Sequence, residues 1–190
     1  MLEFPIEAAT TALVLIDLQK GIVAAPTVPH AAPDVIARAV RLSAACHAKG
    51  IPVFLVRVDP GPGGVLFPKP AVDLPRPAMA YGPDFADIVP DLTAELADAI
   101  ITKHQPNAFY GTDLEIQLRR RSIRTIILGG IATNVGVEAT ARAAHERGYE
   151  QVFVENVMAA RELDLHTHSV KRIFPTLGRV RTLDQVVAAL

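Results

Sequence analysis

Short apolar runs recur along the chain and alternate with segments of helical periodicity. The runs are of strand length and cover Ala12–Ile16, Val53–Val58, Ile100–Thr102, Thr125–Leu128, Val152–Val154 and, more weakly, Arg179–Arg181. Runs without an alternating polar face are typical of strands that are buried on both sides in a parallel sheet. The pattern therefore predicts a mainly parallel sheet that helices cover on both faces.

The segments between the runs place apolar residues three and four positions apart, which predicts amphipathic helices. They cover Asp34–Lys49, Thr112–Arg121, Val137–Arg147, Leu163–Ile173 and Leu183–Leu190. Thr112 and Glu115 have the spacing of a capping box, and Gly50 and Gly148 stand where helix C-caps belong. The alternation predicts an α/β chain that forms a three-layer α/β/α sandwich around a Rossmann-like, doubly wound sheet.

One segment interrupts this alternation. Asp59–Pro90 is rich in proline and glycine, and a loop of this length in a compact domain is usually a lid, a binding loop or an interface arm. No internal repeat, charge block or linker divides the sequence. We therefore predict a single domain over residues 1–190.

The balance of charges argues against two classes of partner. Lys and Arg number 19 and Asp and Glu number 20, so a formal net charge of -1 offers no basic field for nucleic-acid phosphates. The N-terminal stretch MLEFPIEAATTALVLIDLQ has neither the basic flank of a signal peptide nor the roughly 20 apolar residues of a membrane span. We expect a cytoplasmic protein that binds neither nucleic acid nor membrane.

The chain has a single cysteine, Cys46, so an internal disulfide is impossible. Cys46 falls on the apolar stripe of the predicted helix Asp34–Lys49, together with Leu42. Reactive thiols lie at exposed, electropositive places such as the first turn of a helix. We therefore predict that Cys46 is packed in the core and has a structural role.

Ligands of doubly wound sheets bind beyond the carboxyl ends of the strands. This rule selects Asp17, Arg57, Lys103 and the turn that starts at Gly129. Lys103 could reach back over the sheet edge to Asp17, and such a pair can hold a carboxyl group and a substrate oxygen in one site. Two plainer interpretations stay open, in which Asp17 caps the following turn and Lys103 is a solvated charge.

The stretch GGIATNVGVEAT, Gly129–Thr140, connects a strand to a helix through small residues. Asn134 is the predicted N-cap, and the backbone N–H groups of Val135–Val137 are expected to point outward at the positive end of the helix. A carboxylate or a developing oxyanion would be stabilised there. The alternative is a tight turn whose glycines serve only close packing.

We expect no metal and no cofactor. His166 and His168 are two residues apart on a predicted helix, so they point to different faces and are expected to be packed or exposed instead of ligating. The GPGG sequence at Gly61–Gly64 lies in the irregular segment and does not open a helix after a strand. It is therefore no dinucleotide-binding fingerprint.

Three blocks of the sequence resemble the isochorismatase-like, or cysteine hydrolase, superfamily. They are LVLIDLQKG at Leu13–Gly21, ITKHQPNAFYGTDLEIQLRRRSI at Ile101–Ile123 and ILGGIATNVGVEATARAAHERGY at Ile127–Tyr149. The resemblance implies a Rossmann-like sheet and a catalytic triad of Asp, Lys and Cys. It makes Asp17 and Lys103 the first two members, and Gln19 the residue that accompanies the Asp.

The resemblance also contains a departure. The triad cysteine is expected at the second position after the TN pair, where this sequence has Gly136. The preceding Ile131–Ala132 bond corresponds to a peptide that is typically cis in the family and shapes an oxyanion pocket. Glycine cannot supply a thiolate, so the thiol-dependent amide hydrolysis of the family is not expected. It would return only if Cys46 proved reactive and lined the pocket.

Isochorismatases proper can lack the cysteine, because they hydrolyse a vinyl ether. The resemblance therefore implies that Asp17 acts as a general acid on a small anionic substrate, beside Lys103, and releases pyruvate. The alternative is a non-catalytic member that binds a small molecule or serves as an oligomeric scaffold.

Three further residues are weaker candidates for contact with the substrate. Arg57 could bind a carboxylate through its guanidinium, and Phe109 and Tyr110 could form the pocket wall. The resemblance also implies a homo-oligomer, dimeric or larger. In it, the Asp59–Pro90 segment is the candidate for closing over the substrate or contacting another subunit.

Overall fold

The computed structural model describes residues 6–74, 81–92 and 96–190. Within them one sheet has six strands in the order β3-β2-β1-β4-β5-β6, and every neighbouring pair is parallel. The strands are β1 (Thr11–Ile16), β2 (Val53–Val58), β3 (Ala99–Lys103), β4 (Thr125–Ile131), β5 (Glu150–Ala159) and β6 (Arg179–Arg181). The order reverses between β1 and β4, so the predicted doubly wound α/β class is confirmed.

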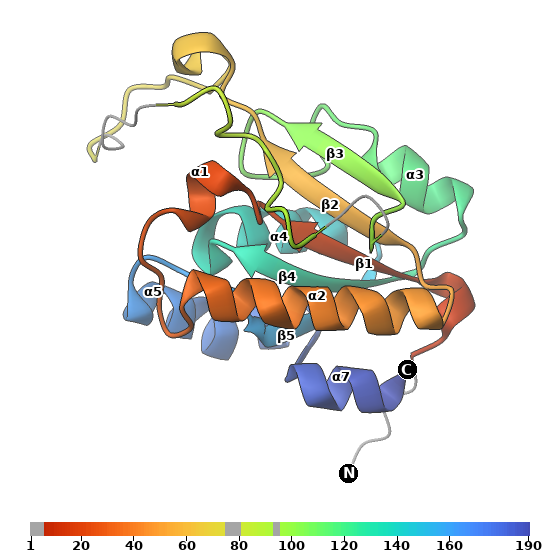
Figure 1. Ribbon diagram of the computed structural model, residues 1–190. Helices are drawn as coiled ribbons and strands as arrows, with labels where there is room; N and C mark the ends of the chain where they lie inside the picture. Colours follow the sequence, from red (N-terminus) through yellow and green to blue (C-terminus); the bar gives the residue numbers. More distant parts are fainter. Residues whose placement is uncertain (1–5, 75–80, 93–95) are drawn as a thin grey trace.

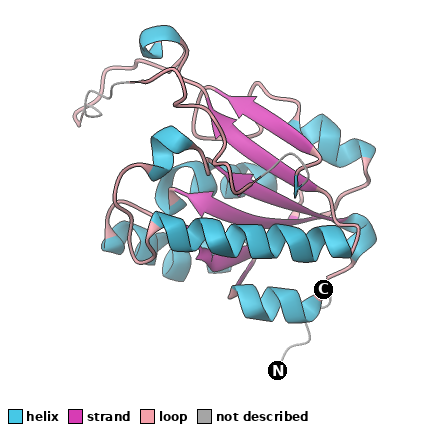
Figure 2. Cartoon of the chain, viewed as in Figure 1, coloured by secondary structure: helices cyan, strands magenta, loops and turns pink. Residues whose placement is uncertain are grey.

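Helices cover both faces of this sheet and complete the three layers (Figure 1; Figure 2). One face packs on α2 (Ala32–Ala48) and α7 (Leu183–Ala189). The other packs on α3 (Leu114–Arg120), α4 (Glu138–Glu146) and α6 (Phe174–Leu177). All six residues of β1 are buried, as expected for a central strand that is covered on both sides.

The remaining helical elements are short, and the sequence pattern did not separate them. They are η1 (Ala8–Thr10), α1 (Lys20–Val23), η2 (Pro62–Gly64), the π-helical turns η4 (Thr133–Val137) and η5 (Ser169–Ile173), and α5 (Leu163–His168). Among the described residues, none of the helices has both the length and the hydropathy to cross a membrane.

The helix ends confirm one prediction and correct another. Gly50 and Gly148 follow the ends of α2 and α4 with φ values of 71° and 79°, where glycine is favoured. The expected capping box at Thr112 is absent, because the helix begins later and the Thr112 hydroxyl accepts from the Leu114 amide at 3.2 Å. A capping box does form at the start of α7, between Thr182 and Gln185.

The turn after β4 begins later than the sequence suggested. β4 continues through Gly129 and Gly130 to Ile131, because Gly130 lets β1 come close: a Cβ there would lie 2.1 Å from the Ile16 carbonyl oxygen. Asn134 is therefore not an N-cap. It lies inside the π-helical turn η4, which leads directly into α4.

β5 carries an irregularity that the apolar pattern did not predict. Leu128 pairs with Phe153 and Gly130 pairs with Met158, so two steps along β4 are matched by five along β5. Bulges of this kind bend a strand and redirect side chains. Here the bulged segment contains Glu155 and Asn156, which are half-buried between the buried Val154 and Val157.

The described residues of the Asp59–Pro90 segment, 59–74 and 81–90, belong to an arm whose first part projects from the body of the molecule (Figure 1). Its residues 75–80 lie outside the described part of the chain. Apolar side chains on the arm are exposed, including Val65 at 61%, Val72 at 56% and Leu74 at 89%. At its return to the body, the ring of Phe85 packs edge-on against Tyr81.

Candidate active site

Asp17 and Lys103 meet at the carboxyl end of the sheet, as their positions in the sequence predicted. Asp17 directly follows β1 and Lys103 ends β3. The Lys103 Nζ lies 2.8 Å from the Asp17 Oδ2, and the two residues are 1% and 5% exposed. The pair is thus a buried ion pair, which excludes a solvated Lys103.

The backbone at Asp17 fixes the direction of its carboxyl group. Asp17 has a φ of 54°, which is uncommon for a residue with a side chain, and its N–H donates to the Val56 carbonyl at 2.8 Å. Its Oδ1 is buried and has no hydrogen-bond partner among the residues that the structure describes. One carboxylate oxygen is therefore held by Lys103, and the other keeps its capacity to form a hydrogen bond.

Burial raises the pKa of Asp17 from 3.8 to about 6. The charge and hydrogen bond of Lys103 act in the opposite direction, but they do not outweigh the loss of hydration. Asp17 can therefore carry a proton at a pH where an ordinary aspartate cannot. This property suits a general acid or a residue that exchanges protons with a substrate.

Gly136 lies directly against this pair. A Cβ at position 136 would lie 2.8 Å from Ile16 Cγ2, 2.9 Å from the Asp17 Oδ2 and 3.7 Å from the Lys103 Nζ. The turn η4 thus packs its backbone so closely on the carboxylate that a side chain at position 136 would have to displace a neighbour. The structure brings together the three positions Asp17, Lys103 and Gly136 that the sequence singled out.

The Ile131–Ala132 peptide that precedes the turn is cis, as the resemblance implied. The Val135 and Val137 N–H groups both donate to the Ala132 carbonyl, at 3.1 and 3.3 Å. The expectation that the amides of Val135–Val137 point freely outward is therefore wrong for these two. The backbone hydrogen bonds of a π-helical turn occupy them.

The model of the isochorismatase domain matches residues 11–185 of the chain. The chain belongs to the isochorismatase family. The matched range covers nearly all of the predicted single domain and includes Asp17, Lys103 and Gly136.

Relatives of the family match over most of their length. The chain is 45% identical over 185 residues to the isochorismatase family protein YecD of Escherichia coli O157:H7, and this match covers 97% of this chain and 98% of that protein. It is 34% identical over 167 residues to a ureidoacrylate amidohydrolase RutB of Methylorubrum extorquens, covering 75% of this chain and 67% of that protein. A solved isochorismatase family protein from Burkholderia thailandensis superposes with a TM-score of 0.92 at 43% identity, covering 98% of each chain.

Gln19, which the resemblance pairs with Asp17, makes three hydrogen bonds to the backbone. Its side chain is fully buried, and its Nε2 donates to the carbonyl oxygens of Val58 and Phe85, both at 2.9 Å. Its Oε1 accepts from the Val58 N–H at 2.7 Å. The amide of Gln19 therefore fastens the end of β2 and the return of the arm to the strand end that bears Asp17.

Arg57, predicted to bind a substrate carboxylate, lies on the other side of the sheet from Lys103. Side chains alternate along a strand, so Arg57 shares the face of Leu55, whereas Lys103 shares the face of Ile101. The Arg57 Nε donates to the Thr102 hydroxyl at 3.0 Å. The sequence placed Arg57 at the correct sheet edge but did not decide its face.

The two aromatic candidates also separate. Phe109 is 5% exposed and stacks on Tyr149 in the core, with ring centroids 5.8 Å apart. It supports the helical layer and does not stand as a free pocket wall. Tyr110 is 70% exposed.

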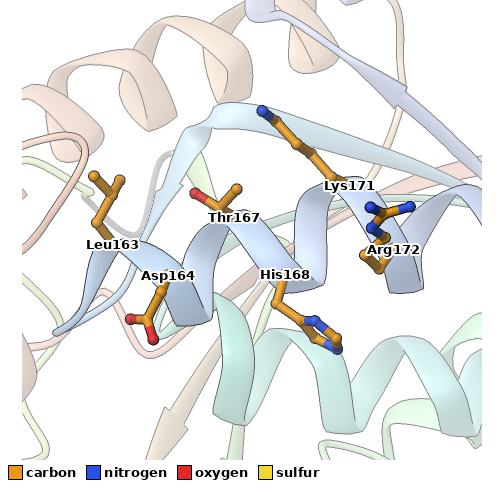
Figure 3. A pocket seen from close by; sticks show the side chains of 6 residues that line it. All are labelled: Leu163, Asp164, Thr167, His168, Lys171 and Arg172. Atoms are coloured by element: carbon orange, nitrogen blue, oxygen red, sulfur yellow. The ribbon is translucent and has the colours of Figure 1, made fainter.

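Two of the hollows that described residues line lie away from the pair of Asp17 and Lys103. One of about 700 Å³ runs along α5 and η5 and is lined by Leu163, Asp164, Thr167, His168, Lys171 and Arg172. Figure 3 shows these side chains diverging from the helix, with Asp164 and His168 on one side and Thr167 and Lys171 on the other. They do not converge on a ligand, as the polar groups of a binding pocket do.

The second hollow, of about 280 Å³, lies at the base of the arm. Asp59, Tyr81 and Phe85 are among the residues that line it. The Asp59 N–H donates to the Lys103 carbonyl at 2.9 Å, so this hollow adjoins the strand end that carries Lys103. Neither Asp17 nor Lys103 is among the residues that line it.

Cys46 lies in the core, 0% exposed, on the face of α2 that packs against the sheet. Burial raises the pKa of its thiol to about 12. A thiol that holds its proton this strongly is no nucleophile at neutral pH, so the predicted structural role is supported. Among the described residues, no three His, Cys, Asp or Glu side chains are grouped so that they could hold a metal ion.

Proposed function

We propose that this isochorismatase-family hydrolase cleaves a vinyl ether of isochorismate type by general acid catalysis through Asp17. The proposal rests on the state of the Asp17 carboxyl group. It is buried, its pKa is raised to about 6, and its Oδ1 has no partner within the described part of the chain. A carboxyl group in this state can deliver a proton at near-neutral pH.

The reaction begins when the Asp17 proton is transferred to the methylene carbon of an enolpyruvyl group. The carbon becomes a methyl group, and positive charge develops at the neighbouring ether carbon. Water adds there and loses a proton, which restores the Asp17 carboxyl. The hydroxyl proton of the resulting hemiketal then passes to the ether oxygen while the bond from that oxygen to the former enol carbon breaks, so that pyruvate and an alcohol leave.

Lys103 supports this cycle from the other carboxylate oxygen. Its ammonium, 2.8 Å from Oδ2, stabilises the carboxylate that remains after the proton has left. An anionic substrate near the ammonium would compete for it and thereby raise the pKa of Asp17 in the complex. The pair therefore favours small substrates that carry a carboxylate.

The surroundings of Gly136 argue against thiol chemistry at this site. The RutB relative is named for amide hydrolysis. In this chain, glycine occupies the position beside Asp17 and Lys103 where the family resemblance expects the cysteine. The buried Cys46 lies on α2 and cannot substitute for it. We therefore propose that amide hydrolysis through a thiolate is not the reaction of this protein.

The experiment is to incubate the protein with isochorismate and to measure pyruvate. Wild-type protein is expected to release pyruvate, and Asp17→Asn is expected to lower kcat by about 10²- to 10⁴-fold, the usual share of a general acid. Asp184→Asn, at an exposed ion pair with Arg41, serves as the control. Absence of pyruvate, or equal turnover in Asp17→Asn, contradicts the proposal.

The buried ion pair also favours a second candidate, a family member that binds a small molecule without converting it. A carboxylate that an ammonium holds at 2.8 Å is stabilised in its ionised form, in which it has no proton to give. This candidate predicts that a metabolite mixture raises the Tm and that no component is consumed. Formation of a product from the same mixture would rule it out.

We also propose that the protein is a homo-oligomer in which the arm contacts a second copy. The exposed Val65, Val72 and Leu74 on the projecting arm support this proposal. Light scattering after size exclusion is expected to give a multiple of the 20.4 kDa chain mass. Charged substitutions at the three positions are expected to shift the mass toward a monomer.

A further inference from the structure

A second polar cluster joins the turn η4 at its first residue. The Thr133 Oγ1 lies 2.8 Å from the His166 Nδ1, and the two residues are 0% and 3% exposed. Thr133 directly follows the cis peptide, and three residues later the same turn packs Gly136 on Asp17. A buried side-chain contact from α5 therefore holds the turn that borders the candidate active site.

The other nitrogen of His166 faces a carboxylate. His166 Nε2 lies 3.4 Å from the Glu155 Oε1, within ion-pair range although not aligned as a hydrogen bond. His30 approaches the same oxygen with its Nε2 at 3.3 Å. The interaction with His166 lowers the pKa of Glu155 most, and that with His30 lowers it further, against a smaller opposing effect of burial.

The bulge in β5 brings Glu155 to this place, where its carboxylate faces the Nε2 atom of His166. An ionised carboxylate attracts the Nε2–H form of a neutral imidazole, which leaves Nδ1 as the acceptor. The Thr133 hydroxyl then donates to Nδ1. Each group of the chain from Glu155 through His166 to Thr133 thus has a defined role.

We propose that Glu155, His166 and Thr133 form a positioning chain that holds the turn Thr133–Val137 against Asp17. None of the three is a catalytic residue, because they act through the backbone of the turn. Loss of the chain lets the turn move away from the carboxylate and admits water to it. The kinetic consequence rests on the proposed function, whereas the structural consequence does not.

A second side-chain hydrogen bond, between η5 and α4, provides a matched control. The Ser169 hydroxyl, which is buried, donates to the Glu138 Oε2 at 2.7 Å. It joins η5 to the first residue of α4, beyond the turn. Ser169→Ala therefore removes a partly buried side-chain hydrogen bond between neighbouring helical segments and leaves the contact with Thr133 in place.

Four variants separate the links of the chain. Thr133→Val removes the hydroxyl at nearly constant volume, and Thr133→Ser retains it. His166→Asn keeps a polar atom near the position of Nδ1, whereas His166→Gln keeps one near Nε2 and loses the contact with Thr133. We expect Thr133→Val and His166→Gln to be impaired and Thr133→Ser to retain most of the wild-type behaviour. His166→Asn keeps the contact with Thr133 and loses the one with Glu155, so we expect it to be impaired less than His166→Gln.

The first readout is hydrogen exchange of the Val135 and Val137 amides in the full-length protein, which needs no substrate. We expect faster exchange at these amides in Thr133→Val and His166→Gln, and wild-type exchange there in Ser169→Ala. Equal acceleration in Ser169→Ala, or wild-type exchange in Thr133→Val, would overturn the proposal. Exchange at β1 amides, measured in the same samples, reports global unfolding.

The second readout is the release of pyruvate from isochorismate. We expect kcat to fall about 10- to 100-fold in Thr133→Val with little change of KM, as misplacement of a catalytic environment does. Wild-type kcat in this variant would overturn the proposal. If wild-type protein itself releases no pyruvate, the proposed function fails and the exchange measurement alone decides on the positioning chain.

Discussion

Asp17 and Glu155 are two carboxyl groups of one sheet whose pKa values shift in opposite directions. For Asp17 the loss of hydration is the largest effect, so its pKa rises even though Lys103 lies 2.8 Å away. For Glu155 the contact with His166 is the largest effect, so its pKa falls although the side chain is half-buried. A close cationic partner does not by itself keep a carboxylate ionised, because burial and the unsatisfied oxygen also count.

The same difference separates the carboxyl group that is proposed to react from the carboxyl group that is proposed to hold the site in place. Asp17 has an oxygen without a partner in the described part of the chain and can change its protonation, as a reacting group must. Glu155 is approached by two histidines and stays ionised, which suits a fixed structural charge. The turn Thr133–Val137 connects the two groups, because Gly136 packs against Asp17 and Thr133 contacts His166, the partner of Glu155.

The largest test of this contrast removes the ammonium beside Asp17. Lys103→Met is expected to lower the free energy of unfolding by about 3–5 kcal/mol at pH 8, because it leaves a buried charge without its partner. The loss should be smaller at pH 5, where Asp17 takes up a proton. Urea unfolding at both pH values measures the difference.

Lys20→Met is the matched control, because Lys20 forms exposed ion pairs with Asp84 and Asp87. Such pairs contribute about 0–1 kcal/mol, so little change is expected. An equal loss for Lys103→Met at pH 5 and pH 8 would show that Asp17 does not titrate in this range.

The two carboxyl groups should also give opposite dependences of stability on pH. Folding raises the pKa of Asp17 from 3.8 to about 6, so the folded state binds this proton more tightly and stability falls as pH rises between those values. The loss is at most about 3 kcal/mol, at 1.36 kcal/mol for each pKa unit. Glu155 has a lowered pKa, so its contribution is present above its ordinary pKa and is lost as pH falls through the lowered value.

Urea unfolding from pH 3.5 to pH 8 tests these signs. The difference between wild type and Asp17→Asn should fall with rising pH, and that between wild type and Glu155→Gln should rise. Two difference curves with the same slope would remove the contrast between the two groups.

A smaller effect is expected where the turn meets Asp17. Gly136→Ala places a methyl group 2.8 Å from Ile16 Cγ2 and 2.9 Å from the Asp17 Oδ2, closer than ordinary contact. We expect a loss of about 1–3 kcal/mol, typical of overpacking, and a lower kcat because the carboxyl group is displaced. Gly82→Ala is the control, since its Cβ would lie 3.4 Å from Asp84 Oδ1. A neutral Gly136→Ala would show that the turn is not packed on the pair.

The smallest effect is expected at Cys46, an ionisable group that is buried without a charged partner among the described residues. Because burial raises the pKa of its thiol to about 12, iodoacetamide should leave the native protein unlabelled and its activity unchanged. Mass spectrometry of samples treated with and without denaturant measures this, and only the denatured sample should gain an adduct. Labelling of the native protein with loss of activity would revive a thiol mechanism.

Much of the fold could be predicted because the determining information is local. The apolar runs and helical periods located all six strands and the longer helices, and the rule for strand ends brought Asp17 to Lys103. The β5 bulge and the π-helical turn η4 depend on packing between distant segments, which no period in the sequence records. The face of Arg57 and the partners of Gln19 were missed for the same reason.

One feature of the sequence could have indicated the positioning chain. Glu155 and Asn156 interrupt the apolar strand VFVENVMAA, where a charge is costly unless it is paired. His166 then offers a partner eleven residues further on. Pattern alone could not connect them to Thr133, because that contact depends on how α5 packs against the turn.

The Gln19 amide has a consequence for how this protein could change its substrate. It fixes both ends of the arm, at Val58 and at Phe85, next to the strand that bears Asp17. The arm between them can differ in length or composition while its two anchor points and the pair of Asp17 and Lys103 stay in register. The arm could therefore be replaced by the corresponding segment of another family member. A chimaera that keeps Gln19, Val58 and Phe85 should preserve the pair of Asp17 and Lys103 and acquire the substrate selectivity of the protein that supplied the arm.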